Sequence, residues 1–348
     1  MSGPTVPAPT TTTAGRARKL INGRIASLFL ILALAIGITA AVNPRFLGGS
    51  GLTDLLIGSA VIGILAVGLT PVVIARHIDL SIASTTGLSA YVTLSIVVPN
   101  GWGLWQSFAI GAGIGLLVGT VNGLLVAGLN IPSLVVTLGT LSIVRGILYF
   151  YSDAGRFTPD VIPPSLIAMG LDTILDIPII FWITLGFALF AAWWMRYTPV
   201  GRDLYAIGSN PPAAQLVGIN IFQRTLLAFM WSGLMAGIAG VLYIGQFAFV
   251  DASAFINQEL AVVTAVVVGG VNIFGGSGTI IGALLGALLI RVIAGGLVAV
   301  GVDPFWQQAV NGVLLITAIG LDRILALRSQ AKIQRIREDR VEEQSWRE

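Results

Sequence analysis

The chain has 348 residues, of which 55% are hydrophobic and only 10% are charged, whereas a soluble domain carries roughly 25% charged residues. Residues 25–320 hold just 18 of the 35 charged side chains. So few charges cannot build a surface that faces water, so this middle part must face lipid. The composition therefore excludes a soluble enzyme, a nucleic-acid-binding protein and a disordered chain. With no cysteine and a single histidine, we also expect no metal site and no Ser-His-Asp triad.

The chain divides by composition into two polar tails and one apolar domain. Residues 1–24 are rich in Pro and Thr and carry four basic side chains, so we expect a disordered basic tail. Residues 25–322 form the membrane domain, and residues 323–348 form a charged tail.

Stretches of about 17–25 apolar residues predict membrane-crossing helices. Ten candidate stretches lie near residues 25–42, 54–75, 80–98, 105–129, 134–151, 179–197, 224–246, 258–271, 279–299 and 305–322. The eighth is short for a full crossing, and the second and third are separated by very few residues. The predicted fold is therefore an all-α, polytopic membrane helical bundle with about 10 transmembrane segments, within a range of 8–10.

The basic residues are distributed unevenly between the two sides of this bundle. If the N-terminus is inside and each stretch crosses once, the inside segments hold fifteen Lys and Arg residues. The outside segments hold only Arg45 and Arg156. Because Lys and Arg favour cytoplasmic segments, both termini and the 198–223 loop are expected in the cytoplasm.

A weak internal two-fold repeat is visible. Residues 72–90 are similar to residues 267–286, and each copy is followed by Val-Asn-Gly, at 121–123 and at 310–312. Duplicated halves with interrupted helices are common in transporters. Chance similarity between segments rich in Gly, Val and Ile is the alternative.

Charged residues at membrane depth are costly and usually functional. Asp79 lies in the densest polar cluster between spans, but its position ahead of Leu80 favours a cap on the third span. Glu259 begins the eighth span, where a helix dipole alone would favour it. Arg145 and Arg291 lie within spans. They either line a polar path or extend their side chains to the membrane–water interface. The candidates for a translocation path or its gate are Arg76, His77, Asp79, Asn122, Thr137, Arg145, Glu259 and Asn311.

The loop at 198–223 contains a short predicted helix near 211–217, opened by Asn210 and proline and closed by Gly218, with glycine turns on either side. A short helix on the cytoplasmic face suits docking to a soluble partner, and a plain connector is the alternative. The candidates for such a contact are Arg202, Tyr205, Gly208, Asn210, Ala213, Ala214 and Gly218.

Several segments resemble the ribose-type sugar permeases of ATP-binding-cassette importers, including the ribose, rhamnose and autoinducer branches. They include GRDLYAIGSNPPAAQLVGIN (201–220), VNGLLVAGLNIPSLVVTLGTLSIVRG (121–146) and GGSGTIIGALLGALLI (275–290), and the resemblance covers roughly residues 50–322. Ribose permeases usually carry a glycine pair before the IDLS segment (78–81), where this chain has Arg76 and His77. That departure resembles the rhamnose or autoinducer branch.

The resemblance implies a multi-pass permease subunit of the bacterial cytoplasmic (inner) membrane that passes a monosaccharide inward. The chain has no G-x-x-x-x-G-K-[ST] motif, so we expect no cofactor on this chain and ATP with Mg²⁺ on a separate ATPase. The 198–223 loop is then the coupling loop. The implied partners are a cytoplasmic ATP-binding subunit, a periplasmic or extracellular sugar-binding protein, a second permease copy or paralogue, and the lipid bilayer. The alternative function is a proton-coupled secondary sugar transporter that uses Asp79 and Glu259.

Overall fold

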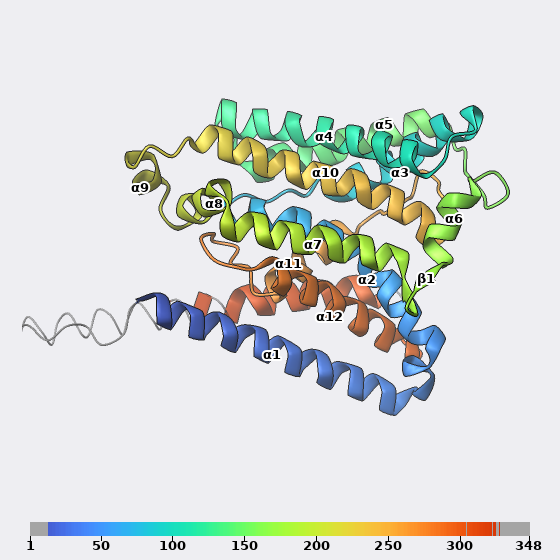
Figure 1. Ribbon diagram of the computed structural model, residues 1–348, viewed down its shortest axis with the longest axis horizontal. Coiled ribbons are helices and arrows are strands. Elements are labelled where there is room, and N and C mark those ends of the chain that lie inside the picture. The colour runs from blue at the N-terminus through green and yellow to red at the C-terminus, as the bar shows by residue number, and fades with distance from the viewer. Residues whose placement is uncertain (1–12, 304, 322, 325–326, 328–348) are drawn as a thin grey trace, which may run out of the picture.

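The computed structural model describes residues 13–303, 305–321, 323–324 and 327. Helices that run roughly along one direction make up most of the molecule (Figure 1). In the described part the strands are limited to β1 (Thr173–Ile174) and β2 (Ile177–Pro178), which pair antiparallel. The prediction of a helical, polytopic membrane bundle is confirmed.

Seven described helices are long and apolar enough to cross a membrane. They are α2 (Gly49–Ile74), α3 (Ile82–Asn100), α4 (Leu104–Leu129), α5 (Ser133–Ser152), α7 (Ile179–Tyr197), α10 (Ile221–Phe247) and α12 (Ile280–Ala299). Three shorter apolar helices, Ala26–Val42, Glu259–Val268 and Trp306–Leu321, lie where the other three crossings are expected.

The first helix differs from the sequence-based expectation at its start. Helix α1 spans Thr13–Val42, so residues 13–24 are helical where we expected a disordered tail. The reason is that Ala, Arg, Lys and Leu are good helix formers and extend the apolar helix that follows. Residues 1–12 lie outside the described residues, as does nearly all of the predicted tail at 323–348.

Burial separates a central layer of helices from a peripheral one. The most apolar windows of α2, α3 and α10 are 89%, 72% and 72% buried, whereas those of α4, α5 and α7 are 33%, 28% and 28% buried. Since no water-facing surface is needed in a bilayer, the exposed apolar sides of the peripheral helices are suited to lipid.

Glycine rows bring the helices close together. Side chains added at Gly115 and Gly119 of α4 would overlap backbone atoms of Gly233 and Phe229 in α10. In the same way, a side chain at Gly282 of α12 would overlap the carbonyl of Gly269, which follows α11 (Glu259–Val268). These rows are packing seams between backbones in direct contact.

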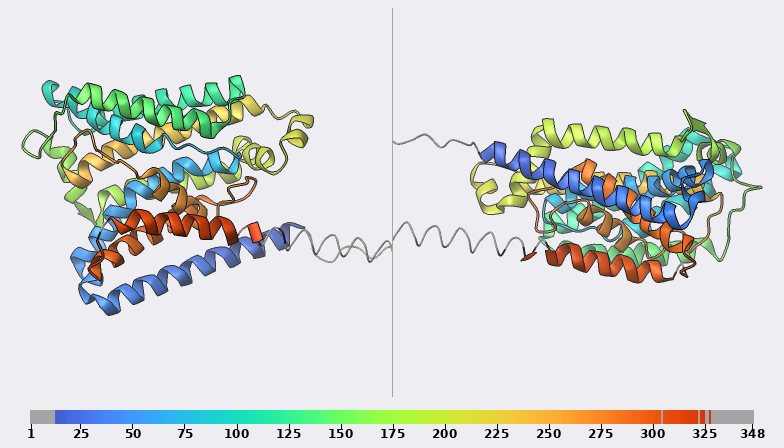
Figure 2. Two further views of the ribbon diagram at one scale, coloured as in Figure 1. Left: turned by 180° about the vertical axis from the view of Figure 1, so that it is seen from behind. Right: turned by 90° about the horizontal axis from the view of Figure 1, so that it is seen from below.

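The two ends of the bundle carry different elements. Helices α8 (Pro199–Ser209) and α9 (Pro211–Leu216) lie at one end, together with the start of α1 and the end of helix Trp306–Leu321 (Figures 1 and 2). The 3-10 helix η1 (Pro44–Leu47), α6 (Pro164–Leu171) and the β1–β2 hairpin lie at the opposite end.

The α8–α9 segment confirms the predicted short helix and corrects its surroundings. The Asn210 side chain caps α9 by accepting a hydrogen bond of 3.2 Å from the backbone nitrogen of Ala213, and Gly218 follows α9 with φ of 84°. Residues 199–209, however, form helix α8 instead of a glycine turn. Thr198 caps α8 and Pro199 occupies its first position, which is a favourable start for a helix.

Two breaks interrupt the helices inside the bundle. The first break, residues 75–81, joins α2 to α3, and the second break, residues 269–279, joins α11 to α12. They lie against each other, because a side chain at Gly275 would overlap Cγ of Arg76. Beside this contact, the backbone nitrogen of Gly276 donates a hydrogen bond of 2.9 Å to the carbonyl oxygen of Ile74, the last residue of α2. The first break carries three of the eight polar residues that sequence analysis selected for a translocation path: Arg76, His77 and Asp79.

Candidate functional site

A buried polar network connects the first break to three helices. The Asp79 carboxylate, 1% exposed, accepts hydrogen bonds from the backbone nitrogen (3.0 Å) and hydroxyl (2.6 Å) of Ser81. Its second oxygen accepts a hydrogen bond of 2.8 Å from the Ser232 hydroxyl of α10. Asn122 of α4 donates to the Ser81 hydroxyl at 2.8 Å and accepts from Thr140 of α5 at 2.6 Å. Both oxygens of the Asp79 carboxylate therefore accept at least one hydrogen bond.

This geometry decides how Asp79 acts. The first helical residue of α3 is Ile82 and its N-cap is Ser81, whose side chain makes no cap hydrogen bond. Asp79 is therefore not the N-cap of α3, because its carboxylate closes a turn two residues earlier. The Asp79 carboxyl group instead ties the first break to α10, and through Ser81 to α4.

Thr137 of α5 contacts the same break, and His77 is part of it. The Thr137 hydroxyl of α5 lies 3.2 Å from the Ile78 carbonyl oxygen, and the Ser133 hydroxyl accepts a hydrogen bond of 3.1 Å from the Ile78 nitrogen. The ring of His77 lies 5.9 Å from that of Phe229 in α10, measured between centroids. Both residues help to hold the break against α5 and α10.

Arg145 of α5 holds a different segment. Its guanidinium donates hydrogen bonds to the carbonyl oxygens of Ala252 (3.3 Å), Ala254 (2.9 Å) and Phe255 (3.4 Å). Those residues belong to the loop that leads into α11. Through these hydrogen bonds Arg145 orders this loop.

A polar cavity of about 290 Å³ lies in the half of the bundle opposite α8 and α9. Sixteen residues from α2, α10, α11, α12, the loop before α11 and helix Trp306–Leu321 line it. Seven of the lining side chains are polar: Tyr243, Gln246, Ser253, Gln258, Arg291, Gln307 and Asn311. Three aromatic rings, Tyr243, Phe247 and Phe255, also face it. The cavity thus combines amides, hydroxyls and aromatic surface.

The structure does not bring the eight predicted path residues into one site. Asn311 lines the cavity, and Glu259 starts α11 next to the lining residue Gln258. Arg291 also lines the cavity, which favours the polar-path alternative for that residue. Sequence analysis missed Gln246, Gln258 and Gln307. A signal was available, because uncharged amides are rare in apolar spans, but their convergence depends on the packing.

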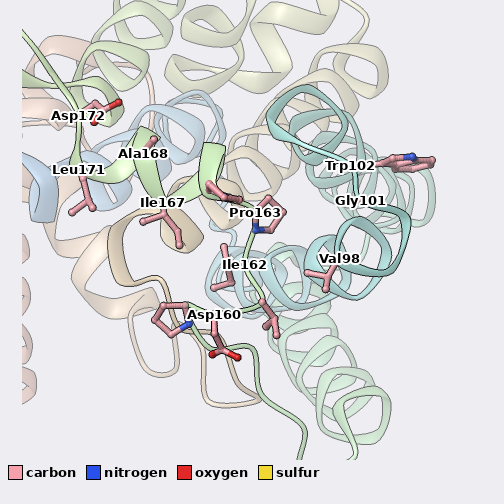
Figure 3. A pocket seen from close by; sticks show the side chains of 13 residues that line it. Val98, Gly101, Trp102, Asp160, Ile162, Pro163, Ile167, Ala168, Leu171 and Asp172 are labelled. Carbon is pink, nitrogen blue, oxygen red and sulfur yellow. The ribbon is translucent and has the colours of Figure 1, made fainter.

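A separate groove of about 590 Å³ lies at the end opposite α8 and α9. Figure 3 shows its walls, with Val98 in the last turn of α3 and Gly101 and Trp102 just after it on one side, and Ile162, Ile167 and Leu171 of the α6 region on another. Two carboxylates, Asp160 and Asp172, also line it. The hydrogen bond of Asp160 with the Thr158 side chain lowers the pKa of this exposed carboxyl.

Helix α8 contacts both breaks at once. The Tyr205 hydroxyl donates a hydrogen bond of 2.9 Å to the carbonyl oxygen of Gly278 in the second break. Burial raises the pKa of Tyr205 to about 12, so the phenol keeps its donor proton at physiological pH. A side chain at Gly208 would overlap the Ile74 carbonyl and the Gly276 nitrogen. Tyr205 and Gly208 thus make their contacts within the permease itself.

The remaining residues of the expected contact surface fall into two groups. Ala214 is only 3% exposed, so it packs against the chain itself and a large side chain there would displace α9. Arg202, Asn210, Ala213 and Gly218 are exposed. Sequence analysis missed Leu216 and Val217, which are 89% and 77% exposed at the end of α9. The exposed surface of α9 is therefore more apolar than the contact surface that we predicted from the sequence.

Comparison with known proteins identifies the family. A family model described as "Branched-chain amino acid transport system / permease component" matches residues 51–319. The chain belongs to this permease family. It is a transport component, as the sequence predicted, and the seven long apolar helices of the described residues agree with a multi-pass membrane protein.

Individual relatives carry a narrower name. The chain is 34% identical over 305 residues to the "Autoinducer 2 import system permease protein LsrC" of Enterobacter sp. (strain 638), covering 88% of each chain. It is 32% identical over 314 residues to the protein of the same name from Salmonella typhi, covering 90% of each. The protein of that name from Escherichia coli (strain K12 / DH10B) is 31% identical over 314 residues, covering 90% of this permease and 91% of the relative. The resemblance to the autoinducer branch is confirmed, and no solved structure matches.

Proposed function

We propose that this permease is the membrane subunit of an ATP-binding-cassette importer for a small, hydroxyl-rich solute of the autoinducer 2 or monosaccharide type. The observation that carries the proposal is the cavity, where amides and hydroxyls from α10, the loop before α11 and helix Trp306–Leu321 converge beside aromatic rings. Such groups match the hydroxyls and ring faces of a sugar. A carboxylate is a favourable partner for the ammonium group of a branched-chain amino acid, and the residues that line the cavity include none. The names of the relatives support the same choice.

The substrate test compares solutes in one strain. Cells that lack their own importers would express the permease with its companion ATPase and binding protein, and depletion of autoinducer 2, ribose, rhamnose and leucine would be measured. We expect depletion of one hydroxylated solute and none of leucine. The variants Gln246→Leu and Asn311→Leu should raise the apparent KM about tenfold each, which corresponds to about 1.4 kcal/mol of lost interaction. Uptake of leucine alone would refute the substrate class.

The energy source is proposed to be ATP hydrolysis on a partner subunit that docks on α8 and α9. The exposed Leu216 and Val217 supply apolar contact area, and Arg202 supplies a charge nearby. Proton coupling through Asp79 and Glu259 is less well supported, because both oxygens of Asp79 already accept hydrogen bonds inside the protein. An uncoupler added while ATP is maintained separates the two, since only a proton-coupled carrier would stop.

The proposed function requires the α8–α9 end of the bundle to lie in the cytoplasm. The absence of cysteine allows a clean test with single cysteines at Leu216 and Leu175, which are 89% and 84% exposed at opposite ends. A membrane-impermeant thiol reagent should label Leu175→Cys in intact cells and Leu216→Cys only after lysis. The reverse pattern would overturn the orientation. A second permease copy or paralogue and a binding protein on the outer face complete the proposed assembly.

A further inference from the structure

Arg76 connects α8 to the first break. It is one of the few non-glycine residues with a left-handed backbone, with φ of 68°, a conformation that costs energy for most side chains. From this position its Nε donates a hydrogen bond of 2.5 Å to the carbonyl oxygen of Gly208, and its Nη2 donates one of 2.9 Å to that of Ser209. Arg76 thus combines an unfavourable left-handed backbone with hydrogen bonds to two specific carbonyl oxygens.

The two carbonyls are the last of α8, which ends at Ser209. The final carbonyls of a helix have no partner within it and carry the negative end of its dipole, so a guanidinium is a well-matched cap. Because one planar group spans two successive carbonyls, the contact fixes direction as well as distance.

The second break meets Arg76 at the same point. A side chain at Gly275 would overlap Cγ of Arg76, and a side chain at Gly276 would overlap Ser209. Gly276 in turn donates to the carbonyl of Ile74, two residues before Arg76. The end of α8, the first break and the second break therefore share one contact, and Arg76 is the side chain at its centre.

We propose that Arg76 is the positioning residue that transmits movement of α8 to both breaks, so that ATP hydrolysis on the partner changes the solute path. This inference rests on the proposed function. Displacement of α8 moves the carbonyls of Gly208 and Ser209, and their hydrogen bonds move Arg76 with them. Asp79, three residues further along the chain, is hydrogen-bonded to Ser232 of α10 and, through Ser81, to Asn122 of α4. Through Gly276 the same displacement reaches α12, whose far half lines the cavity.

The test uses the complete complex and compares Arg76→Gly with wild type. Glycine adopts the left-handed backbone without strain, so this variant removes the side chain and keeps the turn. We measure co-purification of the ATPase, ATP hydrolysis in vesicles, and autoinducer 2 uptake. Arg76→Gly should retain the ATPase within twofold and still hydrolyse ATP, while the uptake per ATP falls at least tenfold. Arg76→Lys keeps one charge without the fork and should fall in between.

Arg196→Ala is the matched control, because it removes another exposed arginine at the same end of the bundle. It should leave uptake per ATP unchanged. A wild-type ratio in Arg76→Gly would overturn the inference. If that variant does not accumulate, the ratio in Arg76→Lys decides, and a wild-type value there overturns it as well. Absence of ATP-dependent uptake in the wild-type complex would instead refute the proposed function itself.

Discussion

The carboxylate of Asp79 accepts a hydrogen bond of 2.8 Å from the hydroxyl of Ser232, which joins the first break to the middle of α10. Both residues are about 1% exposed. A buried carboxyl group is costly unless its oxygens are hydrogen-bonded, and here each oxygen of Asp79 has at least one donor. Asp79 thus fixes the position of α3 relative to α10.

Asp79→Ala should therefore destabilise the permease, because it leaves buried donors of Ser81 and Ser232 without an acceptor. The cost is about 1–3 kcal/mol for each such donor. Asp79→Asn retains one acceptor oxygen and should lose roughly half as much. Thermal unfolding in detergent measures the effect. Asp251 forms the same turn with Ser253, but on the surface, so Asp251→Ala should change the midpoint little. An unchanged midpoint in Asp79→Ala would contradict the structural role.

The glycine seam between α4 and α10 predicts a position-specific effect. Gly119→Leu should lower the yield of folded protein strongly, because its side chain would enter the backbone of α10 at Phe229 and Gly233. Gly113→Leu on the same helix is the control, since no atom lies within 4 Å of its added Cβ. Size-exclusion chromatography of both variants measures the difference. Equal yields would mean that the helices do not pack along this seam.

The exposed end of α9 predicts the strength of ATPase binding. Leu216→Asp and Val217→Asp should each weaken association with the ATPase about tenfold or more, because a charge replaces apolar contact area. Leu175→Asp makes the same change at the opposite end and should not affect association. Co-purification and the midpoint of thermal unfolding are read together. Association that survives both α9 variants would leave α9 as a connector.

Arg145 predicts a kinetic effect at a distance. Its three carbonyl partners lie in the loop that supplies Ser253, Phe255 and Gln258 to the cavity. Arg145→Ala should raise the apparent KM for uptake about tenfold, or about 1.4 kcal/mol, while kcat changes less. Arg156→Ala, an exposed arginine outside the spans, should leave the apparent KM at the wild-type value. A loss of kcat with unchanged KM would mean that the loop does not shape the cavity.

Sequence patterns alone determined the class of molecule and most of its helices. Apolar stretches of membrane length can be recognised in the sequence because lipid excludes charge. Each predicted stretch is a helix at nearly the predicted residues. The α9 helix was predictable too, since Asn210, the prolines and Gly218 act locally. The departure at Arg76 and His77 indicated the rhamnose or autoinducer branch, and the relatives carry the autoinducer name.

Only the tertiary structure decided which polar residues meet. Asp79 and Ser232 are 153 residues apart, and Arg76 and Gly208 are 132 apart, so no local pattern relates them. The glutamines of the cavity are likewise scattered over helices that also carry many lipid-facing positions. Hydropathy specifies that a helix crosses the membrane, but the close glycine contacts between particular helices determine its rotation. That rotation decides whether a polar side chain lines a cavity, joins a buried network or caps a neighbouring helix.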